Sequence, residues 1–191
     1  MKGTEILIAN AFYALLEEKP LSKITVREIV ERCGVNRNTF YYHYRDIPAL
    51  LERIIKARAD QVIREHGRLE SIPDCMEVIV QFCRSDRQAI LHIYRSIQRE
   101  VFLDHLERLM LYAVEEFVAS ASRDLPIPAG DRQLLIRYYK CTLIGIALDW
   151  LNAGMNYDIL AQSSRICELF AGSTRQAFLR CIEAPSDGAA G

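Results

Sequence analysis

The chain has 191 residues, half of them hydrophobic, which is enough to bury the core of one large domain or of a small and a larger one. Its formal net charge of −1 argues against a protein that binds nucleic acid through overall charge alone. The longest apolar run, residues 143–147, is far too short to cross a membrane, so no membrane partner is expected.

The cysteines and the N-terminal residues indicate in which cellular compartment the protein is expected. None of the six cysteines belongs to a CxxC pair, and each lies in or beside an apolar helical pattern, as a small buried hydrophobe would. Reduced thiols in a cytosolic core are therefore a better interpretation than a disulfide framework or a metal site. No cleavable signal peptide is visible, because residues 1–19 are amphipathic and carry three glutamates. We expect a cytoplasmic protein.

The first predicted element is an amphipathic helix over residues 4–18. Apolar side chains recur there at helical spacing, and Lys19-Pro20 ends the pattern. We expect this helix to complete a three-helix core with the two helices that follow, around Phe12, Ile29 and Phe40.

Residues 25–45 predict two short helices joined by a tight turn. Thr25 and Glu28 have the spacing of a capping box, in which each side chain bonds the backbone amide of the other residue. Gly34 follows the last apolar position of the first helix, where a left-handed residue commonly ends a helix. Asn36 is a suitable N-cap for a second helix that runs to about Tyr44.

The second helix of this pair carries an unusual outward surface. Phe40 and Tyr44 fall on the side that faces the first helix, which leaves amides, hydroxyls, aromatic edges and a guanidinium outside. No carboxylate lies between Arg32 and Asp46, and residues 19–45 hold six Lys or Arg against two Glu, a net charge of +4. Such a surface suits contact with phosphates and with base edges in a major groove.

The candidate DNA-contacting residues belong to both helices and their flanks. For Arg27 an ion pair with Glu31, four residues on, is an equally good interpretation, and Tyr44 is better explained as a core residue. The full candidate set is Thr25, Arg27, Asn36, Arg37, Asn38, Thr39, Tyr41, Tyr42, His43 and Arg45.

Residues 25–51 contain several short motifs in a fixed order. They are Thr25-Val26-Arg27-Glu28-Ile29, then Gly34-Val35, then Thr39-Phe40-Tyr41-Tyr42-His43-Tyr44, followed by Arg45 and by Leu50-Leu51. This run resembles the helix-turn-helix of the TetR family of bacterial transcriptional regulators, and the resemblance covers about the first third of the chain. The chain departs from the family at Ile47, where many relatives carry a Lys that reaches a DNA phosphate; Arg45 is the candidate for that contact here.

Beyond the motif the pattern stays helical, and no segment alternates as a strand would. Residues 67–73 break the periodicity and mark the best domain boundary. Further helices are predicted over Asp74–Arg84, from a cap at Asp86, over Ser96–Ser122, over Asp131–Ala153 and over Asp158–Ile182. We expect an all-α chain with a three-helix helix-turn-helix DNA-binding domain over 1–46, a connecting helix over 47–66, a larger helical ligand-binding and dimerisation domain over 67–183 and a disordered tail over 184–191.

The last two predicted helices also resemble this family. Apolar residues wrap nearly all round 131–153, which predicts a helix buried on every side. Leu143-Ile144-Gly145, Asp149-Trp150-Leu151 and Gly154-Met155 resemble the C-terminal half of many TetR-like regulators, in which the last two helices pair with their two-fold mates. The resemblance therefore implies a homodimer through 131–153 and 158–182.

In such regulators the remaining helices enclose a ligand pocket, and aromatic and polar side chains are the candidates here. Taken singly, each is more often a core or interface residue. The candidates are Cys83, Tyr94, Phe102, Tyr112, Tyr138, Trp150 and Asn152.

The resemblance implies a ligand-responsive repressor that binds a pseudo-palindromic double-stranded DNA operator as a homodimer, under control of an unidentified small-molecule effector. The alternative is a DNA-binding regulator controlled by a protein partner, as activator or corepressor, with no small-molecule inducer. An enclosed cavity of ligand size would favour the first and a solid core the second. An enzyme is not expected, because no catalytic triad, Cys-His pair or phosphate-binding glycine loop is present. No cofactor or metal is expected, since His66, His92 and His105 lack metal-ligand spacing.

Overall fold

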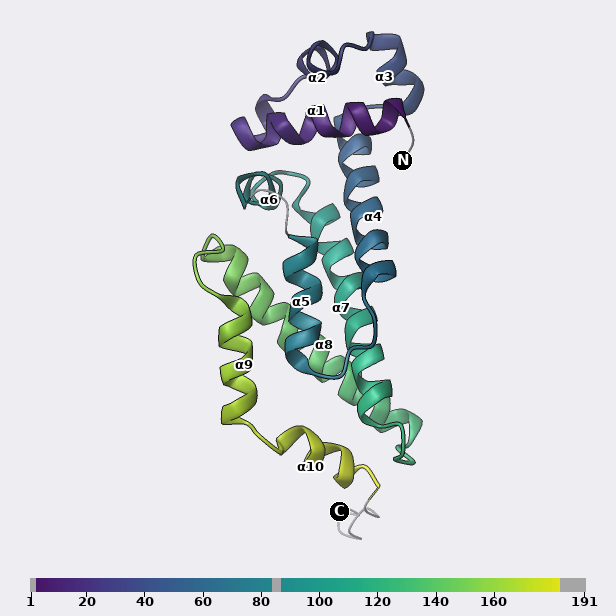
Figure 1. Ribbon diagram of the computed structural model, residues 1–191, viewed down its shortest axis with the longest axis vertical. Helices are drawn as coiled ribbons and strands as arrows, with labels where there is room; N and C mark the ends of the chain where they lie inside the picture. Colours follow the sequence, from purple (N-terminus) through teal and green to yellow (C-terminus); the bar gives the residue numbers. More distant parts are fainter. Residues whose placement is uncertain (1–2, 84–86, 183–191) are drawn as a thin grey trace, which may run out of the picture.

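The computed structural model describes residues 3–83 and 87–182, and these residues form helices and no strands, as predicted. We call α1–α3 the head and α5–α10 the body; α4 runs from one into the other, and α6 lies next to α1 (Figure 1). No helix in the described part is long and apolar enough to cross a membrane. The elements are α1 (Thr4–Glu18), a 3₁₀ turn η1 (Leu21–Lys23), α2 (Val26–Cys33), α3 (Arg37–His43), α4 (Ile47–Glu65), α5 (Ile72–Phe82), α6 (Arg87–Tyr94), α7 (Arg99–Ala121), α8 (Ala129–Asn152), α9 (Ile159–Leu169) and α10 (Ser173–Arg180).

The head is a three-helix unit around a small apolar core. Phe12, Ile29 and Phe40, one from each helix, are fully buried, as the sequence predicts. Ion pairs between Lys19 and Glu28 and between Arg32 and Glu18 tie the end of α1 to α2. The core and these pairs together fix the orientation of α2 and α3 relative to α1.

The helix α4 connects the head to the body. Asp46 caps it by accepting a hydrogen bond from the Ala49 amide at 2.8 Å, and Pro48 occupies its first turn, where no amide donor is needed. Further along, α4 packs on α7 and α5. The Arg58 side chain donates to the carbonyl oxygens of Phe82 at 2.7 Å and Gln81 at 2.8 Å, at the end of α5.

A second connection joins head and body through α6. The helices α1 and α6 are in contact, and a ring nitrogen of His92 lies 2.7 Å from the carbonyl oxygen of Leu16 near the end of α1. The predicted cap of this helix at Asp86, like the predicted helix end at Arg84, lies outside the described residues. The head is thus held through the chain at α4 and through packing at α6.

Three predictions about the body are wrong in detail. The helix α5 begins at Ile72 and not at Asp74, because Ser71 is its N-cap and Asp74 closes the capping box. The helix α8 is not buried on every side: within one chain, Leu134 and Tyr138 are 60% and 64% exposed. The predicted last helix is two helices, since Gly172 takes a left-handed conformation (φ 83°) between α9 and α10. The predicted disordered tail over 184–191 lies outside the described residues.

The body core is filled by large side chains. Phe82 of α5 stacks on Phe102 of α7 with ring centroids 5.4 Å apart, and Met76 and Met110 are fully buried with them. The described cysteines are free thiols, and burial raises the pKa of Cys75 and of Cys83 to about 12. These two thiols are therefore protonated, unreactive core residues at neutral pH.

Candidate nucleic-acid interface

The connection between α2 and α3 forms as the sequence predicts. The Thr25 hydroxyl accepts from the Glu28 amide at 3.3 Å, and the Glu28 carboxylate accepts from the Thr25 amide at 3.0 Å, so the capping box is complete. Gly34 ends α2 in the left-handed region (φ 69°), where a side chain would be strained. The amide of Val35 then bonds back to the Val30 carbonyl oxygen at 3.1 Å. This tight turn sets the angle between the two helices.

Several predicted DNA-contacting residues hold the motif together as caps. The Asn36 Oδ1 atom accepts from the Thr39 amide at 2.8 Å and from the Thr39 hydroxyl at 3.0 Å. Thr25 is likewise occupied by its capping box. The amides and hydroxyls of Thr25 and Thr39 are therefore already engaged, and a contact from these three residues to a phosphate would run through the Nδ2 group of Asn36.

The outward face of α3 carries the other predicted residues. Arg37 and Asn38 are exposed, and the Tyr41 and Tyr42 side chains are 55% and 85% exposed. The Tyr41 ring rests edge-on against the buried Phe40 ring, 5.5 Å between centroids, so its direction is partly fixed before any DNA binds. This face offers amide, guanidinium and phenol groups to a major groove.

His43 and Tyr44 complete α3 and its end. The half-buried His43 ring packs edge-on against Tyr42 with 5.1 Å between ring centroids. Tyr44 is buried, as predicted for a core tyrosine, and burial raises its pKa to about 12. Its hydroxyl has no hydrogen-bond partner among the described residues.

The basic residues of the head differ in what they contact. The Arg27 Nε atom pairs with Glu31 at 2.7 Å, and Arg45 pairs with Asp46 at 3.0 Å. Both arginine side chains are largely exposed, and solvent screens such pairs, so a phosphate can replace the carboxylate at little cost. The exposed Arg37 and Lys23 side chains form no ion pair within the described residues.

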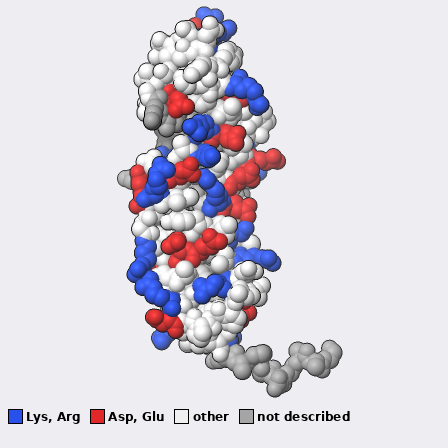
Figure 2. Space-filling model, turned by 90° about the vertical axis from the view of Figure 1, so that its right-hand side faces the viewer, with Lys and Arg blue, Asp and Glu red and all other residues white. Residues whose placement is uncertain are grey.

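Lys23 is a candidate that the sequence analysis missed. It lies in η1, two residues before the Thr25 cap, and a basic residue next to a helix N-terminus is the signal that could have identified it. Figure 2 shows basic groups at the tip of the head and both signs of charge interspersed over the body on that face.

The carboxylates near this face are engaged and stay ionised. Hydrogen bonds from the Lys19 side chain and from Thr25 lower the pKa of Glu28 to about 2. The Ala49 amide, and then Arg45, lower the pKa of Asp46. Both carboxylates bind cations and backbone amides of the motif itself, and α3 carries no carboxylate of its own.

The predicted ligand-pocket residues do not line one cavity. Tyr94 and Asn152 share an open polar pocket of about 450 Å³, where the Tyr94 hydroxyl donates to Asn152 Oδ1 at 2.8 Å. Tyr138 lines a separate groove of about 570 Å³ between α8, α9 and α10. The remaining candidates pack elsewhere: Cys83 and Phe102 are buried, Tyr112 is half-buried on α7, and the Trp150 indole donates to the Tyr157 carbonyl oxygen at 2.9 Å.

Comparison with known sequences matches both halves of the chain. Residues 8–54 match the family model described as bacterial regulatory proteins, tetR family, and residues 70–172 match the TetR-type transcriptional regulator C-terminal region. The uncharacterized HTH-type transcriptional regulator YxbF of Bacillus subtilis (strain 168) is 25% identical over 162 residues, which are 79% of this chain and 40% of that protein. The chain thus matches less than half the length of this curated relative.

Solved structures share the fold at low sequence identity. The dihydroxyacetone kinase operon activator DhaS has a TM-score of 0.74 at 15% identity, over 91% of this chain and 97% of that one. The transcriptional regulator FadR of Bacillus subtilis, solved with stearoyl-CoA, has a TM-score of 0.61 at 17% identity, over 87% and 97%. NalD of Pseudomonas aeruginosa, a secondary repressor of a multidrug efflux pump, has a TM-score of 0.59 at 17% identity, over 87% and 94%.

Proposed function

The chain belongs to the TetR family of bacterial transcriptional regulators, with a DNA-binding helix-turn-helix, and from this premise we propose that it is a cytoplasmic, effector-responsive repressor. In this proposal it binds a pseudo-palindromic operator as a homodimer. The observation that carries the DNA-binding part is the outer face of α3, where Arg37, Asn38, Tyr41 and Tyr42 are exposed on a helix anchored by the fully buried Phe40.

Each exposed residue of α3 has a distinct proposed role. The Arg37 guanidinium and the Asn38 amide suit base edges, whereas the Tyr41 hydroxyl, on its oriented ring, reaches a base or a phosphate. Arg45, Lys23 and the amides at the start of α2 would hold phosphates on either side of the groove. This division predicts that changes on α3 alter sequence preference, while changes at the flanks weaken binding to all sequences.

Exposed apolar surface supports the homodimer. On α8–α10 the side chains of Leu134, Tyr138, Leu169 and Phe170 are each at least 60% exposed within one chain. A soluble protein rarely leaves such groups uncovered together, and a second copy with the same surface would bury them. Because one α3 helix contacts only a few base pairs, two heads at a fixed spacing would supply operator-level affinity.

A regulator controlled by a protein partner is the second candidate. The stacked, buried Phe82 and Phe102 fill the core and favour it, and the pockets elsewhere in the body open to solvent rather than enclose a ligand. DhaS is described as an operon activator, whereas NalD is described as a repressor and FadR was solved with stearoyl-CoA. Effector titrations on the operator complex separate the two candidates.

Selection of bound sites from random DNA with the purified full chain tests the proposed function. We expect a two-fold symmetric site and a dimer on it. Tyr41→Ala and Arg37→Ala should each weaken binding by about 1–3 kcal/mol and blur preference at one position of each half-site. Arg123→Ala, an exposed arginine beyond the end of α7, is the matched control and should bind like the parent. Unchanged sequence preference in both α3 variants, or no selected site, would refute the proposed interface.

A further inference from the structure

A groove of about 660 Å³ separates the head from the body beside α6. Its volume is in the range of small-molecule sites, and its exposed surface is mainly apolar. One wall, on the head side, is formed by Pro20, Leu21, Ser22 and Ile24 with Ile47 and Pro48 at the start of α4. The body wall is formed by His92 with residues 95–98.

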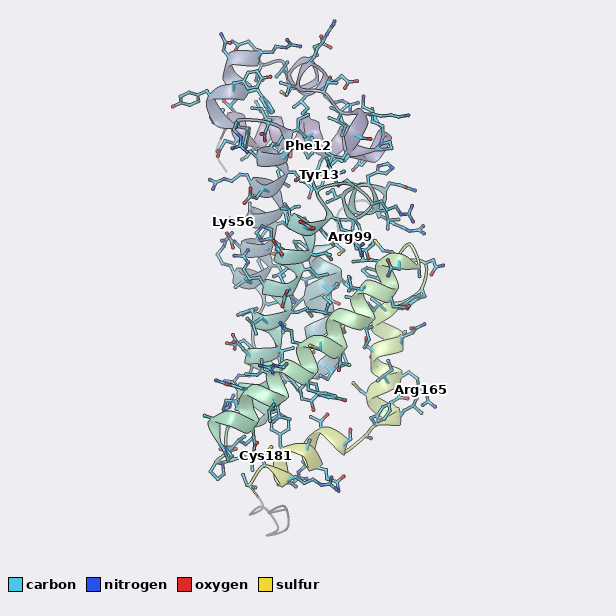
Figure 3. All side chains as sticks on the ribbon, turned by 180° about the vertical axis from the view of Figure 1, so that it is seen from behind. Phe12, Tyr13, Lys56, Arg99, Arg165 and Cys181 are labelled. Carbon is cyan, nitrogen blue, oxygen red and sulfur yellow. The ribbon has the colours of Figure 1, made fainter. Side chains whose placement is uncertain are left out.

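A polar pocket of about 450 Å³ adjoins this groove. Arg95 and Ser96 line both spaces, and the second pocket also contains Tyr94, Arg99 and Asn152. Figure 3 shows Arg99 at the start of α7, between α6 and the end of α8. The groove thus offers an apolar surface against the head, and the adjoining pocket offers arginine side chains against the body.

The arginines of the adjoining pocket form no ion pair with the described acidic residues. The Arg99 guanidinium stands 4.5 Å over the Tyr94 ring and donates to the Tyr94 hydroxyl at 2.7 Å, which holds it in place. Arg87 donates to the Gly154 carbonyl oxygen at 2.6 Å on the same side. Oriented guanidinium groups without a carboxylate are suited to bind a carboxylate or phosphate, often through two parallel hydrogen bonds.

The apolar groove has an unusual residue at its rim. Ile97, in the turn between α6 and α7, is 93% exposed, although it borders a groove lined by isoleucine, leucine and proline side chains. A ligand with an apolar portion in the groove would cover Ile97 together with Leu21 and Ile47. The burial of this surface would add to the affinity that the arginines provide.

We propose that this groove binds the effector, a small amphipathic anion whose carboxylate or phosphate pairs with Arg95 and Arg99 and whose apolar part lies between head and body. The proposal rests on the proposed function as an effector-controlled regulator and names its ligand class and site. It differs from the sequence-based expectation of a pocket enclosed by the body helices.

The position of the groove between head and body explains how a bound ligand would change DNA binding. One wall belongs to η1, to Ile24 that follows it and to the start of α4, and the other belongs to α6 and the turn between α6 and α7. The contact between His92 and Leu16 joins the same two parts. A ligand between them alters the distance between α1 and α6, and therefore the orientation of α3. By linkage, operator DNA weakens ligand binding by the same factor as the ligand weakens operator binding.

Binding of three probes to the full-length protein tests the proposal: octanoate, octyl phosphate and neutral 1-octanol. We expect at least one of the two anions to bind about tenfold or more tightly than 1-octanol, and the tighter one identifies the preferred head group. Arg95→Gln should remove this preference, because it deletes one of the two guanidinium groups proposed to pair with the anion. Ser22→Trp should fill the groove and abolish binding of all three probes. Arg123→Gln, which also removes one exposed arginine, should bind like the parent.

Amide hydrogen exchange of the parent protein locates the bound probe, and this measurement does not depend on any variant folding correctly. In the parent, the tighter anion should protect amides on both walls, within residues 20–24 and 95–99. Protection confined to the interior of α7 and α8, or anion binding equal to that of 1-octanol, would overturn the proposal. Retained anion binding in both Arg95→Gln and Ser22→Trp would overturn it as well. Operator binding is measured on the same samples. Failure to bind any DNA would contradict the proposed function, whereas failure to bind the anions would contradict only the proposed effector site.

Discussion

Arg58 is expected to be the main polar link between the connecting helix and the body. It lies on α4, and its side chain donates to the carbonyl oxygens of Phe82 at 2.7 Å and Gln81 at 2.8 Å. The last carbonyl groups of a helix lack intrahelical donors, and a cation at that end also favours the helix dipole. Arg58→Met keeps much of the aliphatic length but leaves both carbonyl groups without this donor.

The two bonds set the expected magnitude. A hydrogen bond from a charged donor contributes about 1.5–3 kcal/mol, and the two bonds of one guanidinium are not independent. We therefore expect Arg58→Met to lower the free energy of unfolding by about 2–4 kcal/mol. For a chain of this length the melting temperature should fall by roughly 5–15 °C.

Thermal and urea unfolding of Arg58→Met measure this loss, with Lys56→Met as the matched control. Lys56 is an exposed cation on the same helix, labelled in Figure 3, and its replacement should change stability by no more than about 0.5 kcal/mol. Equal stability of the two variants would refute the reasoning, because the Arg58 bonds would then contribute no more than a solvated side chain.

Further variants probe the head and the exposed apolar surface. Folding lowers the pKa of Glu28 from 4.5 to about 2, so the ionised carboxylate stabilises the fold fully above about pH 4.5 and loses this effect as the pH falls towards 2. Glu28→Gln should remove this part of the pH dependence of the melting temperature. The same pH dependence in the variant and the parent would contradict the assignment. Tyr44→Phe deletes a buried hydroxyl that has no hydrogen-bond partner among the described residues, so the free energy of unfolding should stay equal or rise by up to about 1 kcal/mol. A clear decrease of that free energy in urea unfolding would show that the hydroxyl does form a hydrogen bond. Phe170→Glu places a charge on a side chain that is 65% exposed in one chain, and sizing should show dissociation; an intact dimer would place the interface elsewhere. Arg45→Ala should reduce the salt dependence of operator binding by about one phosphate contact, and an unchanged slope would exclude that contact.

Local chemistry made the helix-turn-helix predictable from sequence. The Thr25–Glu28 capping box, the left-handed Gly34 and the Asn36 cap involve residues within three or four positions of one another, so their spacing alone specifies the turn. The burial of Phe40 and Tyr44 follows from helical periodicity for the same reason.

Features that depend on distant packing could not be predicted in this way. The apolar pattern of residues 131–153 predicts that this helix is buried on all sides. It does not indicate whether Leu134 and Tyr138 are buried by the same chain or by a second one. The helix end at Gly172, in contrast, was a local signal that the sequence analysis missed, since a glycine followed by the polar residues 173–176 commonly ends a helix. The groove beside α6 joins residues 20–24 to residues 92–98, and no local signal links segments so far apart.

The paired attachment of the head limits how it can move. An object fixed at one point can turn freely, but one fixed at two points turns only about the line that joins them. The head is fixed by the covalent continuation into α4 and by the contact of α1 with α6, where His92 meets Leu16. While both attachments hold, the head can turn only about one hinge line, and an effector that separates α1 from α6 would release this constraint. Loosening the α6 attachment should therefore leave the head folded but let the proposed dimer accept operators with a wider range of half-site spacings.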